Sequence, residues 1–376
     1  MFFALSDEQT ELAATVRALL DRRADSASVR EAARSGLGHD PGLWSTLCEQ
    51  IGAAALAIPE EYGGAGFTLF ETHVVLEQLG YALVPSPLLG SAVLGAQALL
   101  RSGNTEACAR LLPGIAEGTT SAALAWASAD GGWHRDRSDV HASHPGGGDP
   151  VLTGSAHLVL DGATADVLLV VARNDAGTVG LYEVDPASAG VRRQSTPALD
   201  VTLRFARVDL DSAPARPLTA DAGDLLGELH DVAAVAVTAL QVGAAQRGLD
   251  MTVRYSGERV QFGRQIGSFQ ALKHRMADML VHVETSRTLS WAAAWSAAQG
   301  APDLRERAAT AKAWCSDALN TVAGETVQLH GGIAITWEHD AQLLFKRAHA
   351  MSQLFGQPHE HRRRYFEHLG LATDRG

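Results

Sequence analysis

Two segments carry residues whose types and spacing suit contact with a phosphate group. The first is Glu258-Arg259-Val260-Gln261-Phe262-Gly263, in which the planar guanidinium of Arg259 can donate two parallel hydrogen bonds to a pyrophosphate. The second is Gln328-Leu329-His330-Gly331-Gly332, whose glutamine can donate and accept and whose paired glycines let phosphates approach main-chain amides. Taken singly, Arg259 would pair with a helix acid and the glycines would simply end a helix. Together and in this order, the residues favour a phosphate contact.

Long helices must position these segments. Apolar residues at helical spacing predict one long helix ending near Gly257, a second from Phe269 to about Gln299 and a third from about Arg305 to Leu329. Short connections between long helices imply an antiparallel bundle. The region up to about Gly118 is also mainly helical, whereas short apolar runs separated by Gly, Pro, Asp and Asn predict strands from Thr119 to about Asp221.

The sequence therefore predicts an α+β fold that is mainly α. Its expected parts are an N-terminal helical domain (1–118), a middle β domain of barrel or sandwich type (119–221) and a C-terminal four-helix bundle (222–376). This layout, the two segments above and the loop Ile58-Pro59-Glu60-Glu61-Tyr62-Gly63-Gly64 resemble acyl-CoA dehydrogenases over essentially the full length.

The resemblance implies FAD as the cofactor and an acyl-CoA thioester as the substrate. It also implies a set of residues that hold the adenine and pyrophosphate arm of an FAD belonging to the neighbouring subunit. These cofactor-binding residues are Arg259, Phe262, Gly263, Ile266, Phe269, Gln328, Gly331 and Gly332.

The half of the site that faces the flavin ring differs from the family pattern. Family members open the β domain with a Thr-Glu-Pro-Gly-Ala-Gly-Ser-Asp loop, and the matching stretch here is 125–133, Ala-Trp-Ala-Ser-Ala-Asp-Gly-Gly-Trp. A later Trp-Ile-Thr/Ser-Asn element is matched by Leu158-Val159-Leu160-Asp161. Leucine cannot donate the hydrogen bond that stabilises a reduced flavin.

A catalytic base is also missing at both places where the family carries one. Removal of the α-proton needs a carboxylate, but the expected positions hold Gly356 and Ala233. No catalytic residue is therefore assigned in this chain. Glu228, Asp231 and Glu360 lie near enough in sequence to be displaced bases, although each is more simply a surface acid.

This asymmetry predicts a partner subunit. The chain resembles actinobacterial acyl-CoA dehydrogenases of steroid side-chain breakdown, which form α2β2 heterotetramers. The expected partners are thus a homologous acyl-CoA dehydrogenase subunit that supplies the base, and an electron-transferring flavoprotein, which is usual for the family. Two alternatives are a self-sufficient homotetramer with a displaced base and a non-catalytic scaffold on the same fold.

Composition excludes several other classes of protein. A net charge of -12 and few Lys/Arg clusters argue against nucleic acid as a partner. The 3 cysteines are far apart and lack metal-ligand spacing, so neither a metal site nor a disulfide framework is expected. The sequence shows no targeting segment and no uninterrupted apolar run of membrane-spanning length, which predicts a cytoplasmic protein without a membrane partner.

Overall fold

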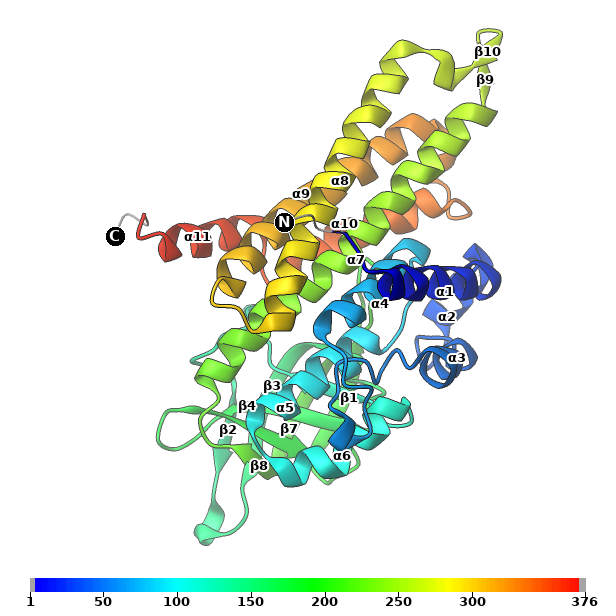
Figure 1. Cartoon of the computed structure of the whole chain (residues 1–376). Helices are drawn as coiled ribbons and strands as arrows, with labels where there is room; N and C mark the ends of the chain where they lie inside the picture. The colour runs from blue at the N-terminus through cyan, green and yellow to red at the C-terminus, as the bar shows by residue number, and fades with distance from the viewer. Residues whose placement is uncertain (1–3, 372–376) are drawn as a thin grey trace. The chain divides into compact units, whose positions relative to one another are not determined.

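The computed structural model describes residues 4–371 and divides into two compact units. Unit 1 comprises Met1–Glu31, His73–Val84 and Ala234–Gly376, and unit 2 comprises Ala32–Thr72 and Pro85–Ala233. The long helix α7 (Gly223–Glu258) belongs to both units. Each unit is described separately below, with labels as in Figure 1.

Unit 1 is helical. Besides most of α7, it contains α1 (Asp7–Arg23), the first part of α2 (Ser26–Arg34), α4 (Leu69–Ala82) from His73 onward, α8 (Gln270–Gln299), α9 (Leu304–His330), α10 (Asp340–Gln353) and α11 (Pro358–His368). Helix α9 packs against α8, α10 and α11. Its core joins apolar residues of α7, α8, α9 and α10, among them Leu249, Val283, Leu319 and Leu344. A short hairpin of β9 (Val260–Gln261) and β10 (Arg264–Gln265) connects the ends of α7 and α8.

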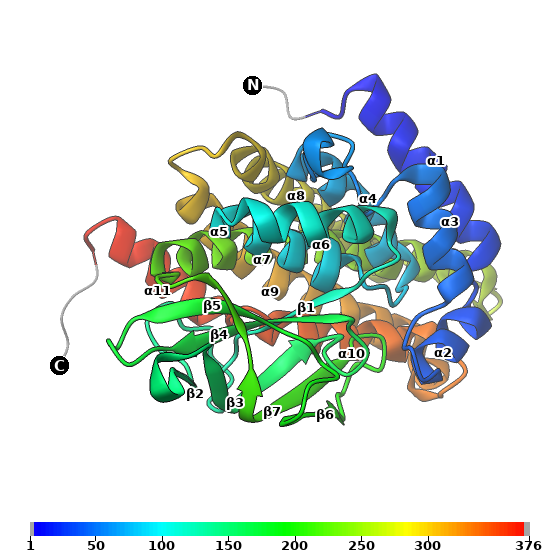
Figure 2. The same ribbon diagram turned by 90° about the horizontal axis from the view of Figure 1, so that it is seen from below.

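Unit 2 is built on one eight-stranded sheet with the strand order β6-β7-β3-β2-β4-β5-β8, in which β1 pairs with β4 off this path. Figure 2 shows the sheet beside the helices of its own unit. The strands are β1 (Ala122–Ala125), β2 (Val140–Ser143), β3 (Val151–Leu160), β4 (Val167–Arg173), β5 (Val179–Val184), β6 (Val191–Thr196), β7 (Phe205–Pro214) and β8 (Arg216–Thr219). The helices are α3 (Pro41–Ile51), a π-helical segment η2 (Leu88–Gly95), α5 (Ala96–Ser102) and α6 (Thr105–Glu117).

The fold class predicted from the sequence is confirmed: a helical N-terminal part, a central sheet and a C-terminal helical part. The boundaries at 118 and 221 stay a prediction. Strands β1 to β8 all lie within the stretch 119–221 in which the sequence predicts strands. Residues 201–204 form a turn before β7 begins at Phe205, and α6 runs through Pro113 to Glu117.

Helix α7 is long and apolar enough to cross a membrane by length and composition, but 78% of its most apolar window is buried inside the protein. Such burial is typical of a core helix. This window is not an uninterrupted apolar run, so the sequence gives no sign of it when only such runs are considered.

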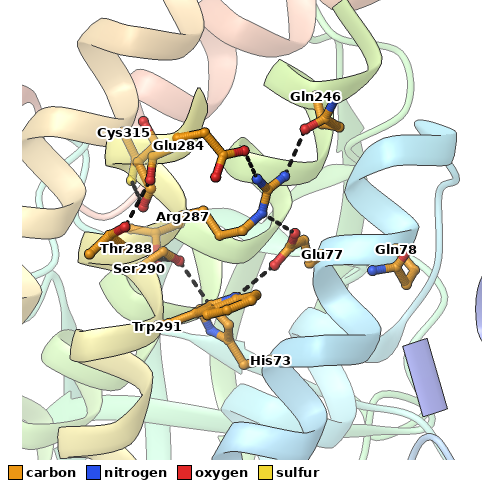
Figure 3. A network of polar contacts seen from close by, with 12 residues as sticks. His73, Glu77, Gln78, Gln246, Glu284, Arg287, Thr288, Ser290, Trp291 and Cys315 are labelled. Atoms are coloured by element: carbon orange, nitrogen blue, oxygen red, sulfur yellow. Dashed lines mark hydrogen bonds and ion pairs between the residues drawn. The ribbon is translucent and has the colours of Figure 1, made fainter. Parts of the chain in front are cut away.

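A buried polar network ties α4 to α7 and α8 within unit 1 (Figure 3). Arg287 of α8 donates from Nε to Glu77 Oε1 of α4 (3.1 Å) and from Nη2 to Gln246 Oε1 of α7 (2.8 Å). The indole N–H of Trp291 donates to Glu77 Oε2 (2.9 Å). Each oxygen of the Glu77 carboxylate thus accepts a hydrogen bond, which offsets the cost of burying its charge.

Candidate cofactor and active site

The first phosphate-contact segment lies on the exposed hairpin at the end of α7. The backbone N–H of Arg259 donates to the Tyr255 carbonyl (2.9 Å), and the Ile266 N–H donates to the Arg259 carbonyl (2.8 Å), so the hairpin continues directly from the helix. Within the described residues the Arg259 guanidinium makes no hydrogen bond or ion pair, unlike the helix-acid pairing considered above. Phe262 is 92% exposed, and Gly263 has a φ of 75° with open space around it.

Ile266 and Phe269 anchor this hairpin, and both are half-buried. The ring of Phe269 meets that of Phe262 edge to face, with centroids 6.2 Å apart. On the same ring, the guanidinium of Arg264 stacks 4.0 Å from the centroid. Because the stack holds Arg264 against the ring of Phe269, the hairpin presents a second cation, Arg264, in addition to Arg259.

The second segment, 328–332, spans the last turn of α9 and the two glycines that follow it. Gln328 is exposed, and its side chain has no partner among residues 4–371. Gly331 (φ 65°) and Gly332 are exposed, with no atom within 4 Å of an added Cβ. Between the two segments, the ring of Tyr255 stacks on that of His330 with centroids 4.5 Å apart and planes 24° apart. The structure therefore brings the ends of α7 and α9 together.

These residues fit the dinucleotide part of FAD. An unpaired guanidinium and uncovered main chain at glycines are what a pyrophosphate requires, and an exposed aromatic ring suits an adenine face. The arrangement is open to solvent, as expected for a surface that receives a cofactor from a neighbouring chain. The individual contacts of the eight cofactor-binding residues stay a prediction.

The ring-facing loop lies at the end of β1 in unit 2 and is closed on itself. The backbone N–H groups of Ser128, Ala129, Gly131 and Gly132 donate to Gly132 O (3.0 Å), Asp139 Oδ2 (2.7 Å), Ser128 O (2.9 Å) and Asp130 Oδ1 (2.9 Å). The buried indole of Trp126 donates to the His134 carbonyl (2.7 Å). Among the buried side-chain atoms of this loop, the Ser128 hydroxyl lacks a partner within the described residues. The backbone N–H groups of these four residues thus bond acceptors of the chain itself.

The second ring-facing element, 158–161, lies beside this loop. His157 N–H donates to the Ala127 carbonyl (2.9 Å), and a Cβ added to Gly131 would lie 3.9 Å from Leu158 Cδ1. The two elements are therefore neighbours in unit 2. Their side chains, however, offer Leu158 and the buried Leu160 in place of an indole and a hydroxyl.

Asp161 closes this element and was not recognised from the sequence as a candidate acid. It has a φ of 54°, and one carboxyl oxygen lies 2.9 Å from where a Cβ of Gly90 in η2 would be. Its carboxyl makes no hydrogen bond or ion pair with any residue in the range 4–371. Burial raises the pKa of Asp161 to about 7, and the charge of Arg204 opposes this effect. An unpartnered carboxyl in a sequence gives no local signal, so only the structure could find it.

Gly356, the first expected base position, is closed to a side chain. Its φ is 103°, and an added Cβ would lie 2.9 Å from Nε2 of the buried His361. Its carbonyl accepts a hydrogen bond from Lys312 Nζ (3.1 Å), and the same ammonium donates to the Met351 carbonyl (3.1 Å). Lys312 is fully buried, and this burial lowers its pKa to about 7. The hydrogen bonds of the Lys312 ammonium to these carbonyls therefore hold the loop that contains Gly356.

Ala233, the second expected position, is fully buried on α7. The three acids considered as displaced bases are either paired with other groups or buried in α7. Glu228 is exposed and pairs with Arg101 Nε (3.5 Å), and Glu360 accepts from the Gln357 N–H (2.7 Å) in the capping box of α11. Asp231 is buried two residues before Ala233, on another side of the helix.

Comparison with known proteins agrees with this geometry. Residues 228–369 match the acyl-CoA dehydrogenase C-terminal domain, and residues 6–119 match the acyl-CoA dehydrogenase N-terminal domain. The chain is 43% identical over 360 residues to the acyl-CoA dehydrogenase IpdE2 of Mycolicibacterium smegmatis, covering 96% of this chain and 98% of that protein. This chain belongs to the acyl-CoA dehydrogenase family. Acyl-CoA dehydrogenases use FAD, and the exposed clasp of Arg259 and the glycines accords with it.

Two solved structures extend the likeness. A steroid acyl-CoA dehydrogenase variant described as Tcur3481-Tcur3483 matches with a TM-score of 0.87 and 31% identity, covering 97% of this chain and 98% of that chain. The ChsE4-ChsE5 complex from Mycobacterium tuberculosis matches with a TM-score of 0.89 and 29% identity, covering 99% of this chain and all (100%) of that chain. The name of each structure joins two different components, and the second is described as a complex.

Proposed function

We propose that this chain is the partner subunit of a heteromeric, FAD-dependent acyl-CoA dehydrogenase of the cytoplasm. It clasps the adenine and pyrophosphate arm of an FAD whose ring lies against a homologous subunit, and that subunit supplies the base. The observation that carries the proposal is the closed loop 128–132, in which the backbone N–H groups of Ser128, Ala129, Gly131 and Gly132 bond acceptors of the chain itself. The blocked position at Gly356 supports it independently.

The reaction is the α,β-dehydrogenation of an acyl-CoA. Bound FAD supplies the acceptor for the hydride that leaves the β-carbon, while a carboxylate of the partner removes the α-proton. Arg259 and the open glycines contribute binding energy that orients the cofactor. The paired names of the similar steroid acyl-CoA dehydrogenases support a heteromer, and a steroid-type acyl-CoA is the substrate class that they favour. An electron-transferring flavoprotein is the expected electron acceptor.

The decisive experiment is co-expression with a homologue that carries the Thr-Glu-Pro-Gly-Ala-Gly-Ser-Asp loop and an intact base. We expect a yellow complex with dehydrogenase activity and half as many flavins as subunits. Full flavin occupancy and turnover by this chain alone would contradict the proposal.

A point variant tests the clasp within that complex. Arg259→Ala should lower FAD affinity by about tenfold or more, since a charge-assisted hydrogen bond contributes ~1.5–3 kcal/mol. Arg305→Ala is a suitable control, because Arg305 is an exposed arginine at the opposite end of α9. Unchanged FAD content in both variants would favour the scaffold alternative.

The self-sufficient alternative has one observation in its favour, the unpartnered carboxyl of Asp161 with its raised pKa. A displaced base needs a pKa near the working pH, as this group has. If Asp161→Asn abolishes turnover of this chain purified alone while FAD stays bound, the base belongs to this chain. Inactivity of the wild-type chain alone, with activity only in the complex, removes that alternative.

A further inference from the structure

The two segments of the FAD clasp are joined by a column of three aromatic rings in unit 1. Tyr255 lies in the last turn of α7, His330 ends α9, and His339 caps α10. The His330 ring stacks on the Tyr255 ring, with centroids 4.5 Å apart. It also contacts the His339 ring, with centroids 4.7 Å apart and planes 56° apart. Each clasp segment begins at this column, since Arg259 N–H bonds the Tyr255 carbonyl and Gly331 follows His330.

His330 is held on several sides. Its exposed fraction is 4%, and its Nδ1–H donates to the Thr326 carbonyl one turn earlier in α9 (2.7 Å). The Met251 carbonyl of α7 also faces the imidazole. A ring fixed by two helices in this way sets the distance between their ends, because a buried side chain has few alternative rotamers.

His339 couples the column to its own helix. Its Nδ1 accepts a hydrogen bond from the Ala341 N–H (3.2 Å) at the start of α10, so the neutral ring must carry its proton on Nε2. Protonation of Nδ1 would break this cap and place a positive charge beside the buried ring of His330.

Several charged groups face the pair. Asp340 follows His339 and favours its protonation, whereas Arg30 of α2 opposes it. Arg30 and Arg247 both bond the Asp340 carboxylate, at 3.1 and 3.4 Å, so much of its charge is already compensated. Burial lowers the pKa of both imidazoles. The pair is therefore neutral near neutral pH and becomes charged only in more acidic solution.

We infer that His330 is a positioning residue for FAD: its stack between Tyr255 and His339 sets the spacing of Arg259 and the Gly331-Gly332 segment, and acid loosens this spacing. This inference rests on the proposed clasp. It assigns no chemistry to the histidines, which act through the groups that contact the cofactor.

The test measures FAD release from the co-purified complex, by the gain of flavin fluorescence. We expect His330→Ala to release FAD about 10-fold faster at neutral pH, since the stack is lost. His330→Phe keeps a stacking ring and should stay within about threefold of the wild type. The matched control is His349→Ala, because His349 also bonds a carbonyl one turn earlier (Phe345, 2.9 Å) and contacts an aromatic ring, but outside the clasp.

The dependence of FAD release on pH distinguishes a positioning role of His330 from a purely structural role. Wild-type release should accelerate as the pH falls below about 6.5, the ordinary pKa of histidine, and His339→Asn, which keeps a capping oxygen that does not titrate, should flatten the profile.

If His330→Ala and His349→Ala both retain FAD like the wild type while Arg259→Ala loses it, the inference is overturned and the clasp stands. If Arg259→Ala also retains FAD, the clasp itself fails. Should His330→Ala not fold, the profile of His339→Asn decides, because a slope as steep as that of the wild type contradicts the inference.

Discussion

At the scale of single residues, Gly356 shows why a missing base here is more than a missing side chain. The loop adopts a left-handed conformation with a φ of 103°, and the space beside Cα is taken by His361. A base cannot be restored by one substitution, because any side chain strains the backbone and collides with a buried ring.

Gly356→Ala should therefore lower the free energy of unfolding by ~1–3 kcal/mol. Gly257→Ala serves as its control, since no atom lies within 4 Å of the added Cβ on α7 and alanine favours a helix by ~0.5–1 kcal/mol. Urea denaturation measures both. Equal stability of the Gly356 variant and the wild type would show that this loop yields easily.

Asp161 is the second residue whose surroundings decide its chemistry. Its pKa rises from 3.8 to about 7 on folding, so the folded state binds the extra proton between these values. The contribution of Asp161 to the free energy of unfolding is therefore most favourable below about pH 4. It falls as the pH rises and is least favourable above about pH 7.

Asp161→Asn removes this penalty and should stabilise the protein at about pH 8 by ~1–3 kcal/mol, with little effect near pH 4. Denaturant midpoints of both proteins across this range provide the measurement. A difference that does not vary with pH would mean that the carboxyl is solvated in the folded protein.

At the scale of elements, the carboxylate of Glu77 links α4 to α8 inside unit 1. Arg287 also contacts Glu284 on its own helix, but the Glu284 side chain is 57% exposed whereas that of Glu77 is 11% exposed. The same guanidinium thus has one buried and one exposed partner, which separates the contribution of burial from that of charge pairing.

Glu77→Ala should cost ~3 kcal/mol, since it removes the least exposed acceptor of the half-buried Arg287 and the acceptor of the Trp291 indole. Glu284→Ala should cost less than ~1 kcal/mol. Thermal unfolding of the two variants compares them directly. Similar losses in both would show that the network contributes only through surface charge.

At the scale of the whole molecule, residues used for assembly are those that the isolated chain leaves uncovered. Phe262 is the clearest case, because a 92% exposed phenylalanine contributes little to the stability of its own chain. In the proposed clasp, its ring contacts the adenine end of the FAD.

Phe262→Ala should therefore change the free energy of unfolding by less than ~0.5 kcal/mol yet lower the FAD content of the complex. Phe67→Ala is the matched control, since Phe67 is 59% exposed and belongs to no cofactor segment. Flavin absorbance per subunit gives the answer. Equal FAD content in both variants would remove Phe262 from the clasp.

The amino-acid sequence alone determined the family and the fold class, and it predicted the two clasp segments. These features depend on local order: helical periodicity, breaker residues and a motif in which Arg259 and the glycines lie at set spacings. It also identified Gly356 and Ala233 as non-acidic, since that requires only reading the positions.

Tertiary structure decided the rest, because each remaining fact depends on groups distant in the chain. Hydrogen bonds across the loop 128–132 show that four of its backbone N–H groups, those of Ser128, Ala129, Gly131 and Gly132, are used, and His361 shows that Gly356 is blocked. The raised pKa of Asp161 and the column of Tyr255, His330 and His339 arise from burial and ring contacts that no spacing in the sequence reveals. Burial and long-range contact are properties of the folded chain, so only the fold could disclose them.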